Sequence, residues 1–265
     1  MDKAKRLIID FVEERLQGDI TQLACFDFAQ LQGDRKYGVC GGTFDCDNTN
    51  LANAIYLLVF EDVWRGMSRE SLEKELYRGD TINTFNTTFG RPTAIGGFVG
   101  LNRFEPDKEL QQRVREFHSL YHTIGNFVVL PNARVGRHSI NTFRGMFSQW
   151  RDYIDKFVMA LYQHLTERQN DDNELFRRLI VANAKDFEPY RSQKGFETLM
   201  RKLLLDDCID NDAKPIQLFD TVCHWDKQLT RDIYFQHVVE YLDFSESFIK
   251  KRSAKIVEIL ASKAR

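Results

Sequence analysis

Apolar residues recur at helical spacing along most of this 265-residue chain. The first example is residues 3–16, where Leu7, Ile8, Phe11 and Leu16 fall on one face of a helix and charged residues fill the other face. The chain contains only five prolines, which suits long uninterrupted helices. We therefore predict a mainly α fold, a bundle-like array of helices forming a single domain over residues 1–265.

The same periodicity and its capping residues define further helices. Ser68 and Ser139 are N-cap residues for two of them, and Asn48 or Asn50 is expected to cap a third that is apolar on nearly every side. The predicted helices cover residues 51–67, 69–77, 107–122, 140–168, 172–187 and 192–207, followed by one or two helices between 217 and 263. Asp80 is a plausible cap for another helix, because Ile82 and Phe85 continue a helical spacing.

Residues 19–50 are the irregular part of the chain. Short apolar runs alternate with polar residues and glycines, which predicts either a small β-hairpin near the N-terminus or a packed loop. The hairpin would place one strand in 26–31 and the other in 37–39. Near the C-terminus, a basic turn is expected to form a solvated face, and its positive charge suits the negative end of a helix dipole. It contains Lys250, Lys251, Arg252 and Lys255.

Charge and hydropathy exclude several classes of protein. The net charge of -2 argues against a surface that grips nucleic acid as a whole, although a local basic patch is compatible with it. No stretch approaches the roughly 20 apolar residues that span a bilayer, so we expect no membrane partner. Acidic residues interrupt the apolar run at the N-terminus, so this run does not resemble a signal peptide. We therefore expect a cytoplasmic protein. No phosphate loop or dinucleotide-binding glycine pattern is present, and we expect no cofactor.

The cysteines and histidines are candidate metal ligands. Cys25, Cys40 and Cys46 could supply three ligands, and Cys223 is followed by His224, but no C-x-x-C pair is present. The odd count of five cysteines suggests reduced thiols.

A second metal arrangement involves His118 and His122, which lie four apart on one helical face at a spacing that can hold zinc. Ser119 occupies the position where a metalloprotease motif has glutamate. We predict no metal site, and a metal-dependent hydrolase is an alternative.

The stretch 121–145 is the least ordinary part of the sequence. It contains an apolar run that stops at Pro131, and it concentrates polar side chains with directional hydrogen bonds: His122, Asn126, Asn132, His138, Asn141 and Arg144. Asn141 and Arg144 lie three apart in the first turn of a predicted helix and therefore share a face.

A second polar block lies in residues 78–86 and contains Arg78, Asp80, Asn83 and Asn86. We predict that the two blocks face one another across a cleft and form a pocket for a small anionic ligand. The predicted ligand-binding residues are Arg78, Asp80, Asn83, Asn86, His122, Asn126, Asn141 and Arg144. In the alternative interpretation, the asparagines satisfy loop backbone groups and cap helices.

The residues HTIGNFVVLP at 122–131, followed by NTFRG at 141–145, resemble the core of an uncharacterised bacterial protein family. The segment 77–86 resembles an earlier block of that family, which implies no known activity. The same stretch is weakly similar to the C-terminal HNH nuclease domain of GmrSD-type restriction enzymes. The residues that fit this outline are Ile124, Gly125, Asn126, Leu130, Asn132 and Asn141. An HNH site needs an upstream histidine, usually after Asp or Glu, and the chain has no such pair.

Three functional hypotheses follow. The first is a non-catalytic helical protein that binds a small ligand or a protein partner through the polar pocket. The second is a nucleic-acid-associated defence or regulatory protein with a degenerate HNH-like core. The third is a metal-dependent hydrolase.

Overall fold

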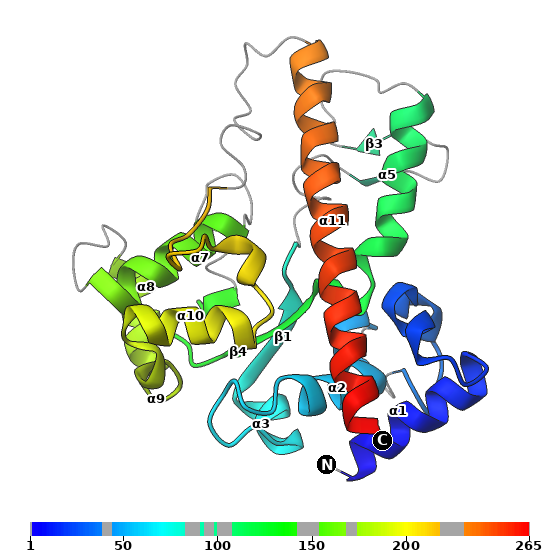
Figure 1. Cartoon of the computed structure of the whole chain (residues 1–265), viewed down its shortest axis with the longest axis horizontal. Helices are drawn as coiled ribbons and strands as arrows, with labels where there is room; N and C mark the ends of the chain where they lie inside the picture. Colours follow the sequence, from blue (N-terminus) through cyan, green and yellow to red (C-terminus); the bar gives the residue numbers. More distant parts are fainter. Residues whose placement is uncertain are drawn as a thin grey trace.

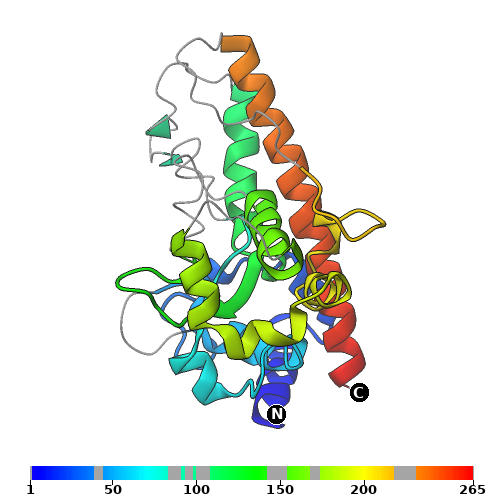
Figure 2. The same ribbon diagram turned by 90° about the vertical axis from the view of Figure 1, so that its left-hand side faces the viewer.

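The computed structural model describes residues 2–38, 44–82, 91–92, 98–99, 108–141, 154–167, 174–217 and 231–264. The longest described element is α11 (Arg231–Ala264), a helix of 34 residues against which α1, α2 and α5 pack. The mainly α fold predicted from the periodicity is confirmed, and Figures 1 and 2 show the long rod of α11 from two sides. None of the described helices combines the length and the apolar run that crossing a membrane requires.

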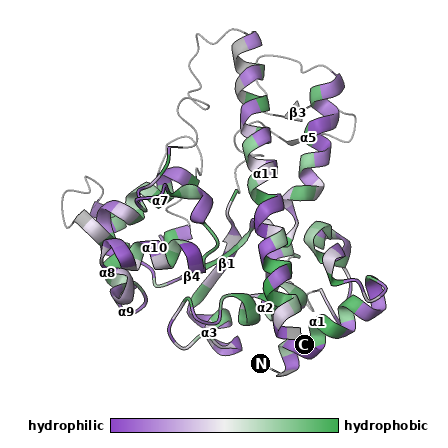
Figure 3. Cartoon of the chain, viewed as in Figure 1, coloured by the Kyte–Doolittle hydropathy of each residue, from purple (hydrophilic) through white to green (hydrophobic). Residues whose placement is uncertain are grey.

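The N-terminal helices are α1 (Asp2–Arg15), α2 (Asn50–Val59) and α3 (Arg69–Lys74). Ser68 caps α3 as predicted, whereas the N-cap of α2 is Thr49, whose hydroxyl accepts a hydrogen bond from the Ala52 amide. α2 ends at Val59, earlier than the predicted residue 67, and the chain then turns through Gly66, which has a φ of 69°. Figure 3 shows α2 as mostly hydrophobic, which agrees with its burial.

Three short 3-10 helices connect α1 to α2: η1 (Ile20–Cys25), η2 (Phe28–Leu31) and η3 (Cys46–Asn48). The described part of this region is therefore a packed loop and not the hairpin that was the other prediction. The reason is local: the carboxylates of Asp19 and Asp27 accept hydrogen bonds from the amides of Thr21 and Ala29, and each bond starts a helical turn. Val39, at the end of the proposed second strand, lies outside the described residues.

The main strand pair is formed by β1 (Leu76–Asp80) and β4 (Phe127–Pro131), which run antiparallel from Leu76 opposite Pro131 to Asp80 opposite Phe127. The prediction that Asp80 caps a helix is wrong, because Asp80 is the last residue of a strand. β4 offers a partner strand whose five residues are all buried, and Thr81 and Ile82 after β1 are not helical. Residues 83–90 lie outside the described part. β2 (Arg91–Pro92) and β3 (Phe98–Val99) form a second, two-residue pair.

α5 (Lys108–Tyr121) runs parallel to α11 and leads through η4 (Ile124–Asn126) into β4. Figures 1 and 2 both show α5 beside the first half of α11. The Arg113 guanidinium forms ion pairs with Asp243 and, at 3.3 Å from its Nε to Oε1, with Glu246. Further along α11, the Ser253 hydroxyl lies 3.5 Å from the hydroxyl of Thr123, which follows α5.

The remaining elements lie to the left of β1 and β4 in Figure 1. They are α7 (Ile154–Tyr162), the π-helical η5 (Gln163–Glu167), α8 (Glu174–Ala182), α9 (Ala184–Phe187), η6 (Glu188–Tyr190), α10 (Gln193–Lys202) and η7 (Asp206–Cys208). α10 stops at Lys202, five residues before its predicted end, and Leu204 follows with a φ of 56°. Ile140 and Asn141 are helical, as predicted, and residues 142–153 lie outside the described part.

One residue of the C-terminal basic turn is buried in the centre of the molecule. Arg252 is 0% exposed, and its guanidinium donates to the carbonyls of Gly125, Phe127, Leu203 and Leu204. The expectation of a solvated basic face is therefore wrong for Arg252, although Lys250 and Lys251 are exposed. The planar Arg252 guanidinium supplies five N–H donors. These donors satisfy carbonyls around the ends of α10 and η4 that have no helical hydrogen-bond partner.

Candidate functional site

Two of the predicted ligand-binding residues, Arg78 and Asp80, lie two apart on β1 and so project from the same face of the strand. The Arg78 guanidinium donates to the Asn53 side-chain oxygen at 3.3 Å. The Tyr121 hydroxyl donates to an Asp80 carboxylate oxygen at 2.9 Å. The carboxyl end of β1 is thus joined to α2 on one side and to the end of α5 on the other.

A buried carboxyl group lies beside this face of β1. Asp47, in η3, is 6% exposed, and its side chain hydrogen-bonds to the Asp45 side chain. A hydrogen bond between two carboxyl groups needs a proton on one of them. Burial raises the pKa of Asp47 well above its usual value, and the charges of Asp80 and Asp45 raise it further, with Arg78 opposing them. These effects favour the protonated form of Asp47.

We call the side chains of Asp45, Asp47, Arg78, Asp80 and Tyr121 the acidic junction. Asp45 is exposed, and Arg78, Asp80 and Tyr121 are half-buried, so the junction extends from the protein interior to the surface. Sequence reasoning missed Asp45 and Asp47. The available signal was the pair of aspartates two residues apart in the FDCDN run, which lies about 30 residues before β1 in the sequence.

Two neighbouring groups of the junction are held neutral. The Tyr56 hydroxyl donates to the Asp47 carbonyl at 3.1 Å, and burial raises its pKa well above the usual value. Burial, followed by the nearby aspartates, raises the pKa of the Cys46 thiol to about 12. A thiol with this pKa is a poor nucleophile at neutral pH, so Cys46 serves as packing.

His122, another predicted residue, lies at the edge of the same region. Its Nδ1 is 3.7 Å from Oδ1 of Asp27, and its carbonyl accepts from the Phe28 amide at 3.1 Å. Burial lowers the pKa of His122, and Asp27 and Asp45 oppose that shift. Burial also lowers the pKa of His118, and the charge of His122 adds to the effect. Both shifts favour neutral imidazoles at neutral pH.

Asn126 connects the two polar blocks directly. It is fully buried; its side-chain oxygen accepts from the Ile82 amide at 2.7 Å and the Thr81 hydroxyl at 2.9 Å. Its amide nitrogen donates to the carbonyls of Tyr121 and Ile82 at 3.0 and 3.2 Å. These bonds use the hydrogen-bonding capacity of the Asn126 side chain. The side chain therefore ties the strand pair together and has few donors or acceptors left for a ligand.

Asn141 lies on the opposite face of β1 from the junction. A Cβ added at Gly79 would be 3.1 Å from the Asn141 side-chain oxygen and 2.9 Å from the Tyr77 ring. Within the described residues, this oxygen is buried and has no hydrogen-bond partner. The other three predicted residues, Asn83, Asn86 and Arg144, lie outside the described part of the chain.

The described thiols are free: Cys25 is exposed, and Cys46 and Cys208 are buried. Cys40, Cys223 and His224 lie outside the described residues. Over the ranges that are described, no group of three or more His, Cys, Asp and Glu side chains is arranged to hold a metal ion.

Comparison with protein families gave one finding. The model of a family of unknown function, DUF6994, matches residues 104–256. This range contains Tyr121, His122 and Arg252, whereas Asp47 and Asp80 precede it. Comparison with curated proteins and with solved structures gave no match.

Proposed function

The chain belongs to the DUF6994 family of unknown function, and from its own geometry we propose that it is a ligand-binding protein whose site is the acidic junction. The observation that carries this proposal is Asp47, a carboxyl group that is 6% exposed and lies beside Asp45 and Asp80. Strongly perturbed acids of this kind are concentrated at functional sites. An apolar side chain would pack at this position without the desolvation cost that Asp47 incurs.

The charges of the junction favour one class of ligand. Among the described residues, its three carboxyl groups lie beside one guanidinium, that of Arg78, whose hydrogen bond goes to the neutral Asn53 side chain. A ligand that donates hydrogen bonds or carries positive charge would complement this excess of acceptors. The anionic ligand expected from the sequence finds less support in the described residues, and so does a phosphate backbone, which requires clustered positive charge.

Ligand binding at the junction should be coupled to proton release. A cationic group placed beside Asp47 favours the ionised carboxylate and lowers its pKa. The raised pKa favours a protonated Asp47 in the free protein. Binding should therefore release a proton, and the apparent affinity should increase with pH as Asp47 ionises. This coupling distinguishes the junction from a site made of ordinary surface aspartates.

The proposal can be tested by thermal shift with defined compounds, each added separately to the full-length protein: spermidine, L-arginine, uridine and sodium phosphate. We expect spermidine or arginine to raise Tm, and we expect Asp47→Asn and Asp80→Asn to abolish that rise. The matched control is Glu258→Gln, an exposed carboxylate on α11 far along the chain from the junction. A rise that survives both junction substitutions would rule the junction out, as would a rise with phosphate alone.

A further inference from the structure

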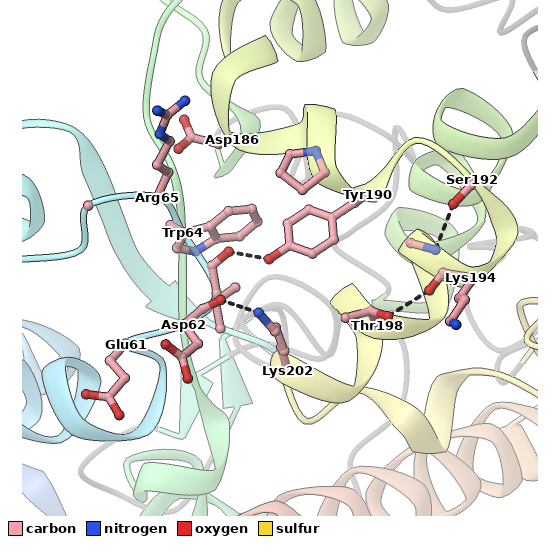
Figure 4. A pocket seen from close by; sticks show the side chains of 14 residues that line it. Glu61, Asp62, Trp64, Arg65, Asp186, Tyr190, Ser192, Lys194, Thr198 and Lys202 are labelled. Carbon is pink, nitrogen blue, oxygen red and sulfur yellow. Dashed lines mark hydrogen bonds between the residues drawn. The ribbon is translucent and has the colours of Figure 1, made fainter.

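A pocket of about 640 Å³ lies between the turn at residues 61–66 and the segment formed by η6 and α10. Figure 4 shows Trp64 and Tyr190 in its centre, with the turn on one side and α10 on the other. None of the residues of the acidic junction lines this pocket. Its volume is in the range of small-molecule sites.

The walls of this pocket are fixed by hydrogen bonds between distant segments. The Trp64 indole donates to the Val129 carbonyl of β4 at 2.8 Å, and the Tyr190 hydroxyl donates to the Val63 carbonyl. The Lys202 ammonium donates to the Asp62 carbonyl. A Cβ at Gly195 would lie 2.7 Å from the Tyr190 carbonyl carbon, so only glycine lets α10 approach η6 this closely. The pocket is therefore a formed feature of the fold.

Asp186 is the unusual residue of the pocket lining. Its residue surface is 6% exposed, and within the described residues its carboxyl group has no hydrogen-bond or ion-pair partner. The adjacent Lys185 does not supply one, because its ammonium pairs with Glu75 at 2.6 Å. Arg65 lines the pocket on the same side as Asp186, and Figure 4 shows its guanidinium near that carboxyl group without a hydrogen bond between them. Burial raises the pKa of Asp186, and the nearby charge of Lys185 opposes that shift. The carboxyl oxygens face the pocket and are not fully buried, so water reaches them in the free protein. A ligand that donates a charged hydrogen bond would replace that water.

The opposite wall carries positive charge as well. Lys194, Thr198 and Lys202 are spaced by four residues and share one face of α10. Lys202 is held by the Asp62 carbonyl, and the Thr198 hydroxyl donates to the Lys194 carbonyl at 2.8 Å. The Lys194 ammonium is exposed and makes no hydrogen bond within the described residues. In Figure 4, Lys194 and Asp186 lie on opposite sides of Tyr190.

We propose that this pocket binds a small zwitterion, with its ammonium group on Asp186 and its anionic group toward Lys194. The ammonium supplies charged donors to a carboxyl group that receives no hydrogen bond from the described residues. The anionic group adds a weaker, solvent-screened attraction to Lys194. The aromatic side chains of Trp64 and Tyr190 provide an apolar centre for the ligand's carbon chain.

Isothermal titration calorimetry on the full-length protein can test this with three probes of equal carbon-chain length: 5-aminopentanoate, 1,5-diaminopentane and glutarate. We expect 5-aminopentanoate to bind most tightly and glutarate least tightly. Asp186→Asn should weaken binding of both amines by about tenfold or more, which is typical of a lost charged hydrogen bond. Lys194→Met should remove the advantage of 5-aminopentanoate over 1,5-diaminopentane.

The matched control is Glu188→Gln. It removes a negative charge two residues after Asp186, at a position outside the pocket lining. It should leave all three affinities unchanged. Thr198→Phe narrows the pocket without removing a charge and should also weaken amine binding. It provides the test if Asp186→Asn does not fold. The proposal is overturned if no probe binds, if glutarate binds as well as the amines, or if a folded Asp186→Asn keeps wild-type amine binding. If Asp186→Asn does not fold, unchanged amine binding by Thr198→Phe overturns it. Loss of amine binding in Asp47→Asn alone would likewise overturn it and assign the amine to the acidic junction.

Discussion

Asp47 illustrates at the scale of a single residue how a side chain can oppose folding near neutral pH. Its pKa in the folded protein is raised by burial and by neighbouring aspartates, whereas an unfolded aspartate has a pKa of about 3.9. The folded state therefore binds the proton more tightly than the unfolded state. The resulting stabilisation is fully present below the unfolded pKa and is lost as pH rises through the folded pKa.

Asp47→Asn is consequently expected to increase the free energy of unfolding at pH 7, because the amide needs no proton and can still donate to Asp45. Each unit by which the pKa is raised corresponds to about 1.4 kcal/mol. The gain should shrink as pH falls toward 4. Urea denaturation at several pH values measures it, and a variant that is less stable than wild type at pH 7 would contradict the protonated state assigned to Asp47.

Arg252, in contrast, is expected to stabilise the folded state, because its burial is compensated by carbonyls from two segments, one after α10 and one at the start of β4. Arg252→Lys replaces a planar group of five donors by a single ammonium that cannot reach the same carbonyls. We expect a loss of more than about 3 kcal/mol, since buried carbonyls lose their partners. Lys251→Ala, which changes the exposed neighbour, should cost less than about 0.5 kcal/mol. Equal effects of the two substitutions in urea denaturation would be inconsistent with this role.

Sequence reasoning located part of the candidate site at the residue scale. Arg78, Asp80 and His122 were singled out from their polar character, and the structure brings them into one region. Asn126 was selected for the same reason, but its hydrogen bonds serve the strand pair. Asp47 could not be identified in this way, because its raised pKa depends on burial beneath β1, which the sequence does not display.

At the scale of elements, the helices with strong apolar periodicity were the predictable ones. α1, α5 and α10 begin within two residues of their predicted starts, and Ser192 caps α10 through the Gly195 amide at 2.9 Å. β1 was missed because its partner, β4, lies about 50 residues further along the chain. Strand pairing at that separation is set by tertiary contacts that a local window does not contain.

Gly125 fixes where η4 meets α11. A Cβ at this position would overlap the Ile249 carbonyl, and it would lie 2.7 Å from the Ser253 amide nitrogen. The Gly125 amide also donates to the Ser253 hydroxyl at 3.0 Å. Gly125→Ala should therefore move η4 away from α11 and destabilise the protein by about 1–3 kcal/mol.

The Gly125→Ala effect can be localised by amide hydrogen exchange. We expect faster exchange in β4 and in residues 249–253 of α11 than in wild type. Unchanged protection of β4, together with an unchanged Tm, would show that the contact between η4 and α11 does not constrain the strand.

At the scale of the whole molecule, α11 links the parts that carry the two proposed sites. α1, α2, α5, η1 and η4 pack against it, and Arg252 joins it to β4 and to the end of α10. The acidic junction lies where η3, β1 and the end of α5 meet, and the 61–66 pocket lies where the turn after α2 meets η6 and α10. The mainly α class followed from periodicity, whereas this arrangement depends on long-range contacts of buried polar groups.

The most direct measurement is a crystal structure of the full-length protein with the compound that gives the largest Asp47-dependent thermal shift. The acidic junction should then contain the compound, with a donor group within about 3.2 Å of a carboxylate oxygen of Asp47 or Asp80. Density for the compound in the 61–66 pocket or on the protein surface, with no part of the compound in contact with the junction side chains, would contradict the proposed function.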